Sequence, residues 1–243
     1  EFNKLTKKVD AVRRCSSEGY FCDKISIEKL KHFVSKEAFN IDGLGKKIIE
    51  GFWKSKFIKY PQDIFKLDYN KIEKLEGWGK LSVENLKYSI NQKKNISLQR
   101  FIFALGIRHI GLENARLLSK NFKSFSNFKN LSKTKKYDDL LNIDGIGETQ
   151  INSIKFFMEN EINIKVLNEL SKVLVINNYV ENKKKGLLKD KSFLVTGKLN
   201  GISRAEVKSL IEENSGKTIS SISKKLNFLI IGEKPTKKKV DYA

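Results

Sequence analysis

Four copies of one short pattern limit the folds open to this chain more than any other feature of its sequence. Each copy ends in an apolar residue followed by glycine, and three copies carry a second glycine two residues earlier. The copies are Ile41-Asp42-Gly43-Leu44-Gly45, Leu75-Glu76-Gly77-Trp78-Gly79, Ile107-Arg108-His109-Ile110-Gly111 and Ile143-Asp144-Gly145-Ile146-Gly147. Their final glycines lie 34, 32 and 36 residues apart, a period typical of repeated helix pairs. Each copy therefore predicts a tight turn between two helices.

The segments around the turns have a helical pattern of apolar residues. Before the first copy they recur at Ile27, Leu30, Phe33, Val34 and Ala38, which is the spacing of one helix face. Residues 25–175 can be read as helices throughout, without a convincing strand. The pattern predicts a mainly α fold with four helix-hairpin-helix motifs, whose hairpins usually pair into modules with approximate twofold symmetry.

Turns of this kind present backbone N–H groups at a helix N-terminus, a geometry that suits a phosphate oxygen. The turns therefore predict contact with a nucleic-acid backbone, without sequence reading. The residues expected to make it are the turn glycines and the basic residues beside them: Gly43, Gly45, Lys46, Gly77, Gly79, Lys80, Arg108, His109, Gly111, Gly145 and Gly147. Lys47 lies beside the first turn as well.

Some residues of the turns allow two interpretations. Leu44, Ile110 and Ile146 are expected in the core, whereas Trp78 could pack there or reach a minor groove. His109 stands where the other copies have glycine, and a surface hydrogen bond is as good an explanation for it as contact with DNA. His32 is expected on a helix surface.

The charge of the chain points the same way with less force. Lys and Arg total 48 against 28 Asp and Glu, a formal charge of +20, which favours a polyanionic partner. Only six of the basic residues are Arg, and Ile and Asn are abundant, as an AT-rich genome would also produce. The charge supports nucleic acid mainly in combination with the repeats.

Other features limit the class of protein. There is no run of 18 apolar residues, so no membrane partner is expected. The chain begins without Met or a signal peptide, which suggests a fragment. Its two cysteines, Cys15 and Cys22, indicate a reducing cytoplasm rather than a disulfide framework. No phosphate-binding loop, metal-binding histidine pair or Ser/His/Asp set is present, so neither catalytic nor cofactor-binding residues are predicted.

The sequence changes character after residue 180. Asn182-Lys183-Lys184-Lys185-Gly186 indicates a linker. Beyond it, residues 192–196, 218–220 and 228–231 are β-prone, and a helix is expected between Ser203, as its cap, and Asn214. This pattern predicts a small α/β unit that is truncated, because some 50 residues are few for a core.

The cysteines alone leave zinc undecided. A structural zinc ion needs four ligands, so either residues before residue 1 complete a site or the two cysteines have no metal role.

A cysteine pair, a helix, four hairpins, a linker and a small α/β segment follow one another in this chain. With that order, several stretches resemble the C-terminal part of the bacterial NAD-dependent DNA ligases: Arg14-Cys15, Leu30-Lys31-His32-Phe33-Val34-Ser35, Phe39-Asn40-Ile41-Asp42-Gly43-Leu44-Gly45 and Phe103-Ala104-Leu105-Gly106-Ile107-Arg108-His109-Ile110-Gly111. The tail is similar to the first half of a BRCT domain at Val195-Thr196-Gly197, Ser203-Arg204, Gly216-Lys217, Ser223-Lys224-Lys225 and Ile231-Gly232-Glu233.

The resemblance implies a division into the second half of a zinc finger (1–24), a helix-hairpin-helix DNA-binding domain (25–180), a linker (181–188) and the start of a BRCT domain (189–243). It implies that Cys15 and Cys22 are two of four zinc ligands. It also implies a monomer that grips nicked duplex DNA during replication and repair, while NAD and Mg are bound by a part outside this chain.

Two other classes of protein remain open. One is a non-catalytic helix-hairpin-helix and BRCT scaffold, such as an accessory region of a repair nuclease or polymerase. The other is a BRCT-centred adaptor for phosphopeptides.

Overall fold

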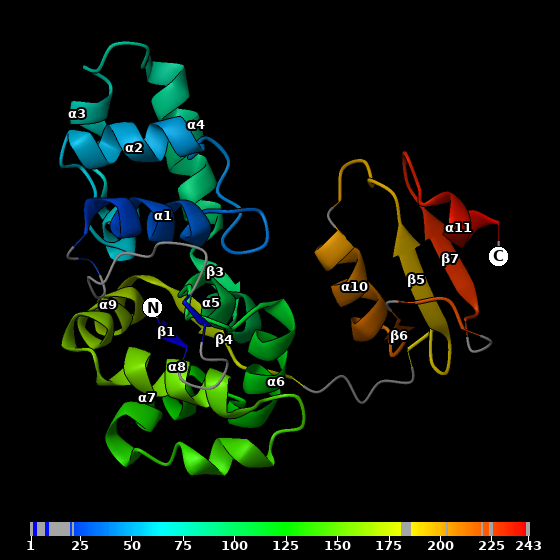
Figure 1. The fold of residues 1–243 in the computed structure, drawn as a ribbon. Coiled ribbons are helices and arrows are strands. Elements are labelled where there is room, and N and C mark those ends of the chain that lie inside the picture. The colour runs from blue at the N-terminus through cyan, green and yellow to red at the C-terminus, as the bar shows by residue number, and fades with distance from the viewer. Residues whose placement is uncertain are drawn as a thin grey trace. The chain divides into compact units, whose positions relative to one another are not determined.

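The computed structural model describes residues 2–3, 8–9, 20, 22–180, 186–202, 204–219, 221–223 and 226–241. The chain divides into two compact units, Glu1–Tyr179 and Val180–Ala243 (Figure 1). The first unit is almost entirely helical, and the second is a small parallel sheet with helices. The expected fold class, mainly α followed by a small α/β part, is confirmed.

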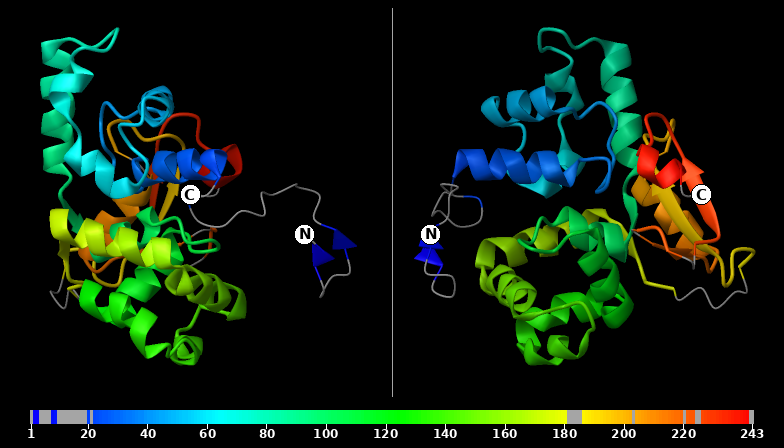
Figure 2. Two further views of the ribbon diagram at one scale, coloured as in Figure 1. Left: turned by 90° about the vertical axis from the view of Figure 1, so that its left-hand side faces the viewer. Right: turned by 45° about the vertical axis from the view of Figure 1, so that its right-hand side comes forward.

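Nine α-helices and two short 3-10 helices form the described part of the first unit. They are α1 (Asp23–Phe33), α2 (Lys46–Lys54), η1 (Pro61–Lys66), α3 (Tyr69–Ile72), α4 (Lys80–Gln92), α5 (Leu98–Ala104), α6 (Leu112–Phe122), α7 (Phe125–Thr134), η2 (Asp138–Asn142), α8 (Glu148–Glu159) and α9 (Glu161–Val173). Figures 1 and 2 show α1–α4 in one group and α5–α9 in another.

Large apolar side chains from nearly every helix make one continuous core. Phe33, Phe52, Phe101 and Phe128 are each at most 2% exposed. Phe33 stacks on Phe39 with 4.2 Å between ring centroids. Because the helices bury their apolar faces in this common core, the turns between them are held at the surface.

The expectation that residues 25–175 contain no strand is wrong at one place. β3 (Asn95–Ser97) pairs in parallel with β4 (Val175–Asn177), and Asn177 Nδ2 donates a hydrogen bond to Asn95 Oδ1 at 2.6 Å. Three residues are too few to show an alternating pattern in the sequence. A second small ladder joins β1 (Phe2–Asn3) to β2 (Lys8–Val9).

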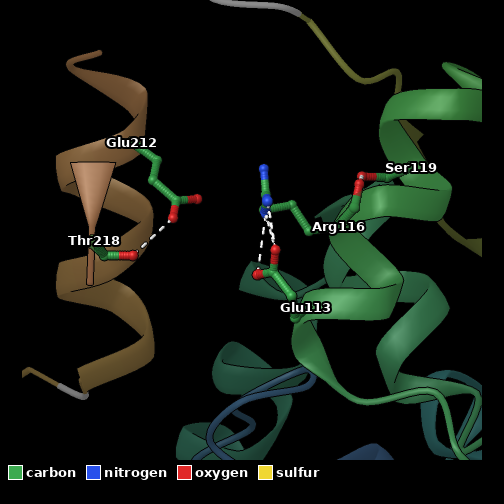
Figure 3. Close-up of polar contacts among 5 residues, drawn as sticks. All are labelled: Glu113, Arg116, Ser119, Glu212 and Thr218. Carbon is green, nitrogen blue, oxygen red and sulfur yellow. Dashed lines mark hydrogen bonds and ion pairs between the residues drawn. The ribbon is translucent and has the colours of Figure 1, made fainter. Parts of the chain in front are cut away.

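In the second unit, β5 (Ser192–Thr196) lies between β6 (Lys217–Thr218) and β7 (Phe228–Ile231), and both pairings are parallel. The unit also contains α10 (Arg204–Glu213) and α11 (Lys237–Val240). Within it, Thr218 Oγ1 donates to Glu212 Oε1 at 3.0 Å (Figure 3). The predicted strands at 192–196 and 228–231 are confirmed, whereas the expected cap Ser203 and linker residues 181–185 lie outside the described residues.

Candidate nucleic-acid interface

The four turns share one backbone conformation. In each, the apolar residue before the final glycine donates its N–H to the carbonyl three residues earlier, at 3.0 to 3.4 Å. The residue directly before this donor has a positive φ in every copy: 86° at Gly43, 80° at Gly77, 62° at His109 and 90° at Gly145. A bond from residue i+3 to residue i with a left-handed residue at i+2 is the pattern of a type II turn. The sequence repeat is therefore a structural repeat.

His109 keeps this conformation although it is not glycine. A left-handed backbone costs a residue with a Cβ about 1 to 2 kcal/mol. Its Nδ1 lies 3.0 Å from Ser153 Oγ, and its carbonyl accepts from Asn114 Nδ2 at 2.9 Å. The structure therefore gives His109 a surface hydrogen bond, one of the two roles expected for it. Contact with DNA stays a prediction.

The final glycine of each turn is the N-cap of the helix that follows. Gly45, Gly79, Gly111 and Gly147 begin α2, α4, α6 and α8, and none of them offers a side chain to cap the helix. The first four N–H groups of an α-helix have no partner within the helix. At the start of each of the four hairpin helices, the backbone N–H donors therefore point outward and have no bond partner in an N-cap side chain. In the fourth hairpin, the N–H of Gly147 itself donates to Gln150 Oε1 at 3.2 Å.

Four of the five other α-helices of these two groups begin differently, the exception being α1, whose N-cap Cys22 makes no side-chain cap hydrogen bond. Asp68, Ser97, Ser124 and Asn160 are the N-caps of α3, α5, α7 and α9, and each side chain accepts from a backbone N–H three residues on. Such a cap is worth about 1 kcal/mol relative to Ala. Within one core, helices that follow a hairpin lack the cap and these four have it.

The final glycines are not required by the fold of the protein itself. Their φ angles lie between −65° and −115°, which any residue adopts. A Cβ built at Gly45, Gly79 or Gly111 would meet nothing within 4 Å, and at Gly147 it would meet only Gln150 Oε1, at 3.4 Å. The missing side chains leave open space above the donors, so another molecule can approach the backbone closely.

All eleven residues predicted to contact a nucleic-acid backbone are exposed. The apolar residues before the final glycines face the other way: Leu44, Ile110 and Ile146 are 3 to 5% exposed, as expected for the core. Trp78 is half-buried, and its ring lies 5.4 Å from that of Phe52. Its packing against α2 favours the first of the two roles considered for it.

Reciprocal contacts join the hairpins in pairs. In the first pair, a Cβ at Gly43 would lie 3.5 Å from Leu86 of α4, while Trp78 of the second hairpin packs on α2. In the second pair, His109 bonds to Ser153 of α8, while Gly145 faces Leu117 of α6. Each turn contacts the outgoing helix of its partner hairpin. The expected paired modules are present, as a first hairpin pair (residues 23–92) and a second hairpin pair (residues 98–173).

The hairpins differ in local charge. The first carries Lys46 and Lys47 after its turn, and the second carries Lys80. The third has Arg108 within the turn, and Glu113 at the start of its outgoing helix forms an ion pair with Arg116 (Figure 3). The fourth has Asp144 and Glu148, and the first and second turns also carry an acidic residue, Asp42 and Glu76. By charge alone, a phosphate is favoured least at the fourth hairpin.

A shallow and largely apolar depression of about 480 Å³ lies between α1 and the third hairpin. Its lining residues are Lys24, Ile25, Glu28, Lys29, His32, Gly106, Ile107 and Ile110. Burial lowers the pKa of Lys29, whose Nζ lies 4.7 Å from the centre of the Tyr20 ring. The depression is open, and two of its polar lining residues bond elsewhere: His32 to the carbonyl of Phe103 and Glu28 to Lys31.

The structure leaves the predicted metal ligands untested. Cys15 lies outside the described residues, and Cys22 is half-buried at the N-cap of α1. Within the described ranges, no three His, Cys, Asp or Glu side chains gather to hold a metal ion. In the same part of the chain, no helix combines the length and apolarity needed to cross a membrane.

Two residues that join the helix groups beneath these turns were missed by sequence reasoning. His32 was expected on a helix surface, but its Nε2–H donates to the carbonyl of Phe103 at 2.8 Å and so joins α1 to α5. Arg100 joins the same two groups of helices. No local pattern announces either contact. The contrast between Gly and Asp, Ser or Asn at helix starts, however, was visible in the sequence.

Two family models match the chain in the order of its units. The model described as "Helix-hairpin-helix motif" matches residues 100–167, which contain the third and fourth hairpins. The model described as "BRCA1 C Terminus (BRCT) domain" matches residues 183–242. Together with the four turns, these matches define a helix-hairpin-helix protein with a BRCT region.

Curated relatives make the class more specific. The chain is 63% identical to a "DNA ligase" of Pelagibacter ubique over all 243 residues, which is 36% of that protein. It is 40% identical over 236 residues to a "DNA ligase" of Rickettsia bellii (strain RML369-C) and 39% identical over 235 residues to one of Rickettsia rickettsii (strain Sheila Smith). The chain spans about a third of the length of these relatives. It is homologous to part of the bacterial DNA ligases, and the expected resemblance to their C-terminal portion is confirmed.

Proposed function

We propose that this chain is the DNA-binding portion of a bacterial DNA ligase, and that its hairpins hold the backbone of a nicked duplex. The observation that carries the proposal is the contrast between the helix starts. Helices after a hairpin begin at glycine with no capping side chain, whereas α3, α5, α7 and α9 are capped. Exposed, uncapped helix starts suit the phosphate groups of a polyanion.

Binding would follow from three features of each turn. The N–H groups at the start of the outgoing helix donate to a phosphate oxygen, and the helix dipole adds to the attraction. The final glycine lets the phosphate approach without meeting a Cβ. Side chains such as Lys46 and Lys80 add positive charge. None of these contacts reads a base, so binding would be largely independent of sequence.

The reaction itself would take place in another part of the protein. The family's chemistry uses a lysine adenylated from NAD and a 5′-phosphate at the nick, and we propose that this ligase is NAD-dependent with those groups, and Mg, bound outside this chain. For zinc, the described residues do not offer a site, because no three His, Cys, Asp or Glu side chains gather among them, and Cys15 lies outside the described ranges. We therefore derive no step through a metal.

The identity to DNA ligases along the whole chain favours this proposal over a non-catalytic scaffold. Nick sealing by the full-length protein of the same gene, supplied with NAD or with ATP, distinguishes the two. Sealing with NAD alone supports the proposal. No sealing with either cofactor, in a protein that binds nicked DNA, supports the scaffold.

The DNA-binding part can be tested with the chain as it stands. We expect fluorescence anisotropy to show binding to nicked and intact duplexes of unrelated sequence with similar affinity. With about four phosphate contacts, the logarithm of the association constant should fall with the logarithm of salt concentration with a slope of roughly −4. A slope near zero, or strong preference for one sequence, would contradict the proposal.

A further inference from the structure

A small set of polar contacts joins the two hairpin pairs. Arg100 lies on α5, in the second pair, and its guanidinium reaches the segment that follows α1 in the first pair. Its Nε donates to the carbonyl of Ala38 and its Nη2 to the carbonyl of Lys36, both at 2.8 Å. These residues are 62 and 64 positions away along the sequence. The guanidinium of Arg100 is therefore held by hydrogen bonds to the protein backbone.

Both ends of this contact lie just before a turn of the candidate interface. Ala38 is three residues before Ile41, where the first turn begins, and Arg100 is seven residues before Ile107, where the third turn begins. The segment around Ala38 is fixed by its own backbone bonds, from Ala38 and Asn40 to Ser35 at 3.0 and 2.8 Å. Arg100 thus links the segment that sets the first turn to the helix that leads to the third.

Other contacts act at the same junction. The Nε2–H of His32 donates to the carbonyl of Phe103 at 2.8 Å, and the two rings lie 4.7 Å apart. Lys66 of η1 forms an ion pair with Glu169 of α9 at 2.9 Å, and β3 pairs with β4. Arg100 differs from these because one planar group with fixed donors spans two carbonyls, which sets orientation as well as distance.

We propose that Arg100 is a positioning residue, which fixes the first hairpin relative to the third so that both hairpin pairs engage one duplex together. This inference rests on the proposed function. When one pair has bound, the second pair meets the same DNA at an effective concentration set by the rigidity of the link. A loosened junction leaves each turn intact but lowers that effective concentration.

The test is a double-mutant cycle in the full chain, with anisotropy on one nicked duplex. The second pair is disabled by Gly111→Asp with Gly147→Asp, which place carboxylates where phosphates would bind. Arg100→Ala should lower affinity about tenfold in the wild-type background and less than about twofold in the disabled background, because cooperation needs two working pairs. An equal loss in both backgrounds would overturn the proposal, since a direct phosphate contact or simple loss of charge gives that result.

Two further variants separate geometry from charge. Arg100→Lys keeps the charge but cannot span both carbonyls in one plane, so most of the loss should remain; full affinity would refute the positioning role. His32→Phe removes a junction bond while keeping an aromatic side chain, and should show the same background dependence. If Arg100→Ala does not fold, His32→Phe takes its place in the double-mutant cycle.

Arg204→Ala is the matched control, because it removes one charge and one arginine–carbonyl bond, from Arg204 Nε to Gly197 O at 2.9 Å, in the second unit. Its effect should be the same in both backgrounds. If the wild-type chain does not bind duplex DNA, or if the glycine variants bind as tightly as it does, the proposed function fails. If those variants weaken binding but Arg100→Ala and His32→Phe show no background dependence, only the positioning role fails.

Discussion

Replacing Gly45 by Asp should stabilise the protein and weaken its binding to DNA, as expected where a site trades stability for function. Gly45 is the N-cap of α2, with φ −65° and ψ 167°, which is the extended backbone that capping residues adopt. A Cβ at this position meets nothing within 4 Å. The Asp side chain can therefore bend back to the helix N–H groups and occupy the place proposed for a phosphate.

The magnitudes follow from the structure. The new cap, together with the lower conformational entropy of the unfolded chain once glycine is replaced, stabilises the protein by about 1 kcal/mol. This raises Tm by roughly 2 to 4 °C. Two negative charges about 5 Å apart repel each other by roughly 1 to 3 kcal/mol near a protein surface. Affinity for duplex DNA should fall about tenfold or more, and the salt slope should lose about one unit with one phosphate contact.

The assay pairs a thermal melt with anisotropy titrations at several salt concentrations. Ser124→Asp is the matched control, because it adds the same charge at the N-cap of α7, where a side chain already caps the helix. It should lower affinity by much less than Gly45→Asp. Equal losses for the two variants, or a lower Tm for Gly45→Asp, would refute the reasoning about uncapped helix starts.

Three other perturbations address single residues. Gly145→Ala should destabilise the protein by about 2 kcal/mol or more, because φ is 90° and the new Cβ would lie 2.9 Å from Leu117 Cδ1. Gly147→Ala should be nearly neutral. Urea unfolding measures both variants, and an equal loss of stability would contradict this reasoning. His109→Gly should keep full stability, because it relieves the left-handed strain while losing the Ser153 bond. His109→Val should lower the free energy of unfolding by about 1 to 2 kcal/mol in the same assay. A Val variant as stable as wild type would contradict the argument from strain. Hydrogen bonds from Lys172 and then Lys66 lower the pKa of Glu169 to about 2. A carboxyl group whose pKa is lower in the folded protein stabilises the fold at pH values above its unfolded pKa, near 4.3, and not at pH values below its folded pKa. The Tm difference between wild type and Glu169→Gln should therefore shrink from pH 5 to pH 2. A Tm difference that does not change with pH would show that these ion pairs do not stabilise the protein.

The sequence contained most of what is needed to predict the turns. Glycine at a fixed offset from an apolar residue has a local cause, because a type II turn needs a left-handed residue at its third position. The same rule explains why His109 aligns with Gly43, Gly77 and Gly145 in the repeat. Which apolar residues are buried also follows from the local helical pattern.

The junction between the hairpin pairs was beyond such reasoning. Arg100 and His32 look like ordinary polar residues on helices, because their partners are backbone carbonyls 62 to 71 residues away. Every residue has a backbone carbonyl, so no residue pattern marks a particular one as an acceptor. Strands of three residues, such as β3, likewise leave no periodic signal. Contacts of this kind depend on how whole helices pack.

The pairing of β3 with β4 has a consequence for the order in which the protein is assembled during synthesis. Asn95 and Asn177, which bond across this ladder, are 82 residues apart, so β3 leaves the ribosome roughly 4 to 16 s before its partner at usual elongation rates. The first hairpin pair can form its local contacts during that interval. The ladder closes only when the last residues of the helical unit have emerged. The β3–β4 contact between the two hairpin pairs is thus completed at the end of translation of this unit, after the residues that make the Arg100 and His32 contacts have emerged.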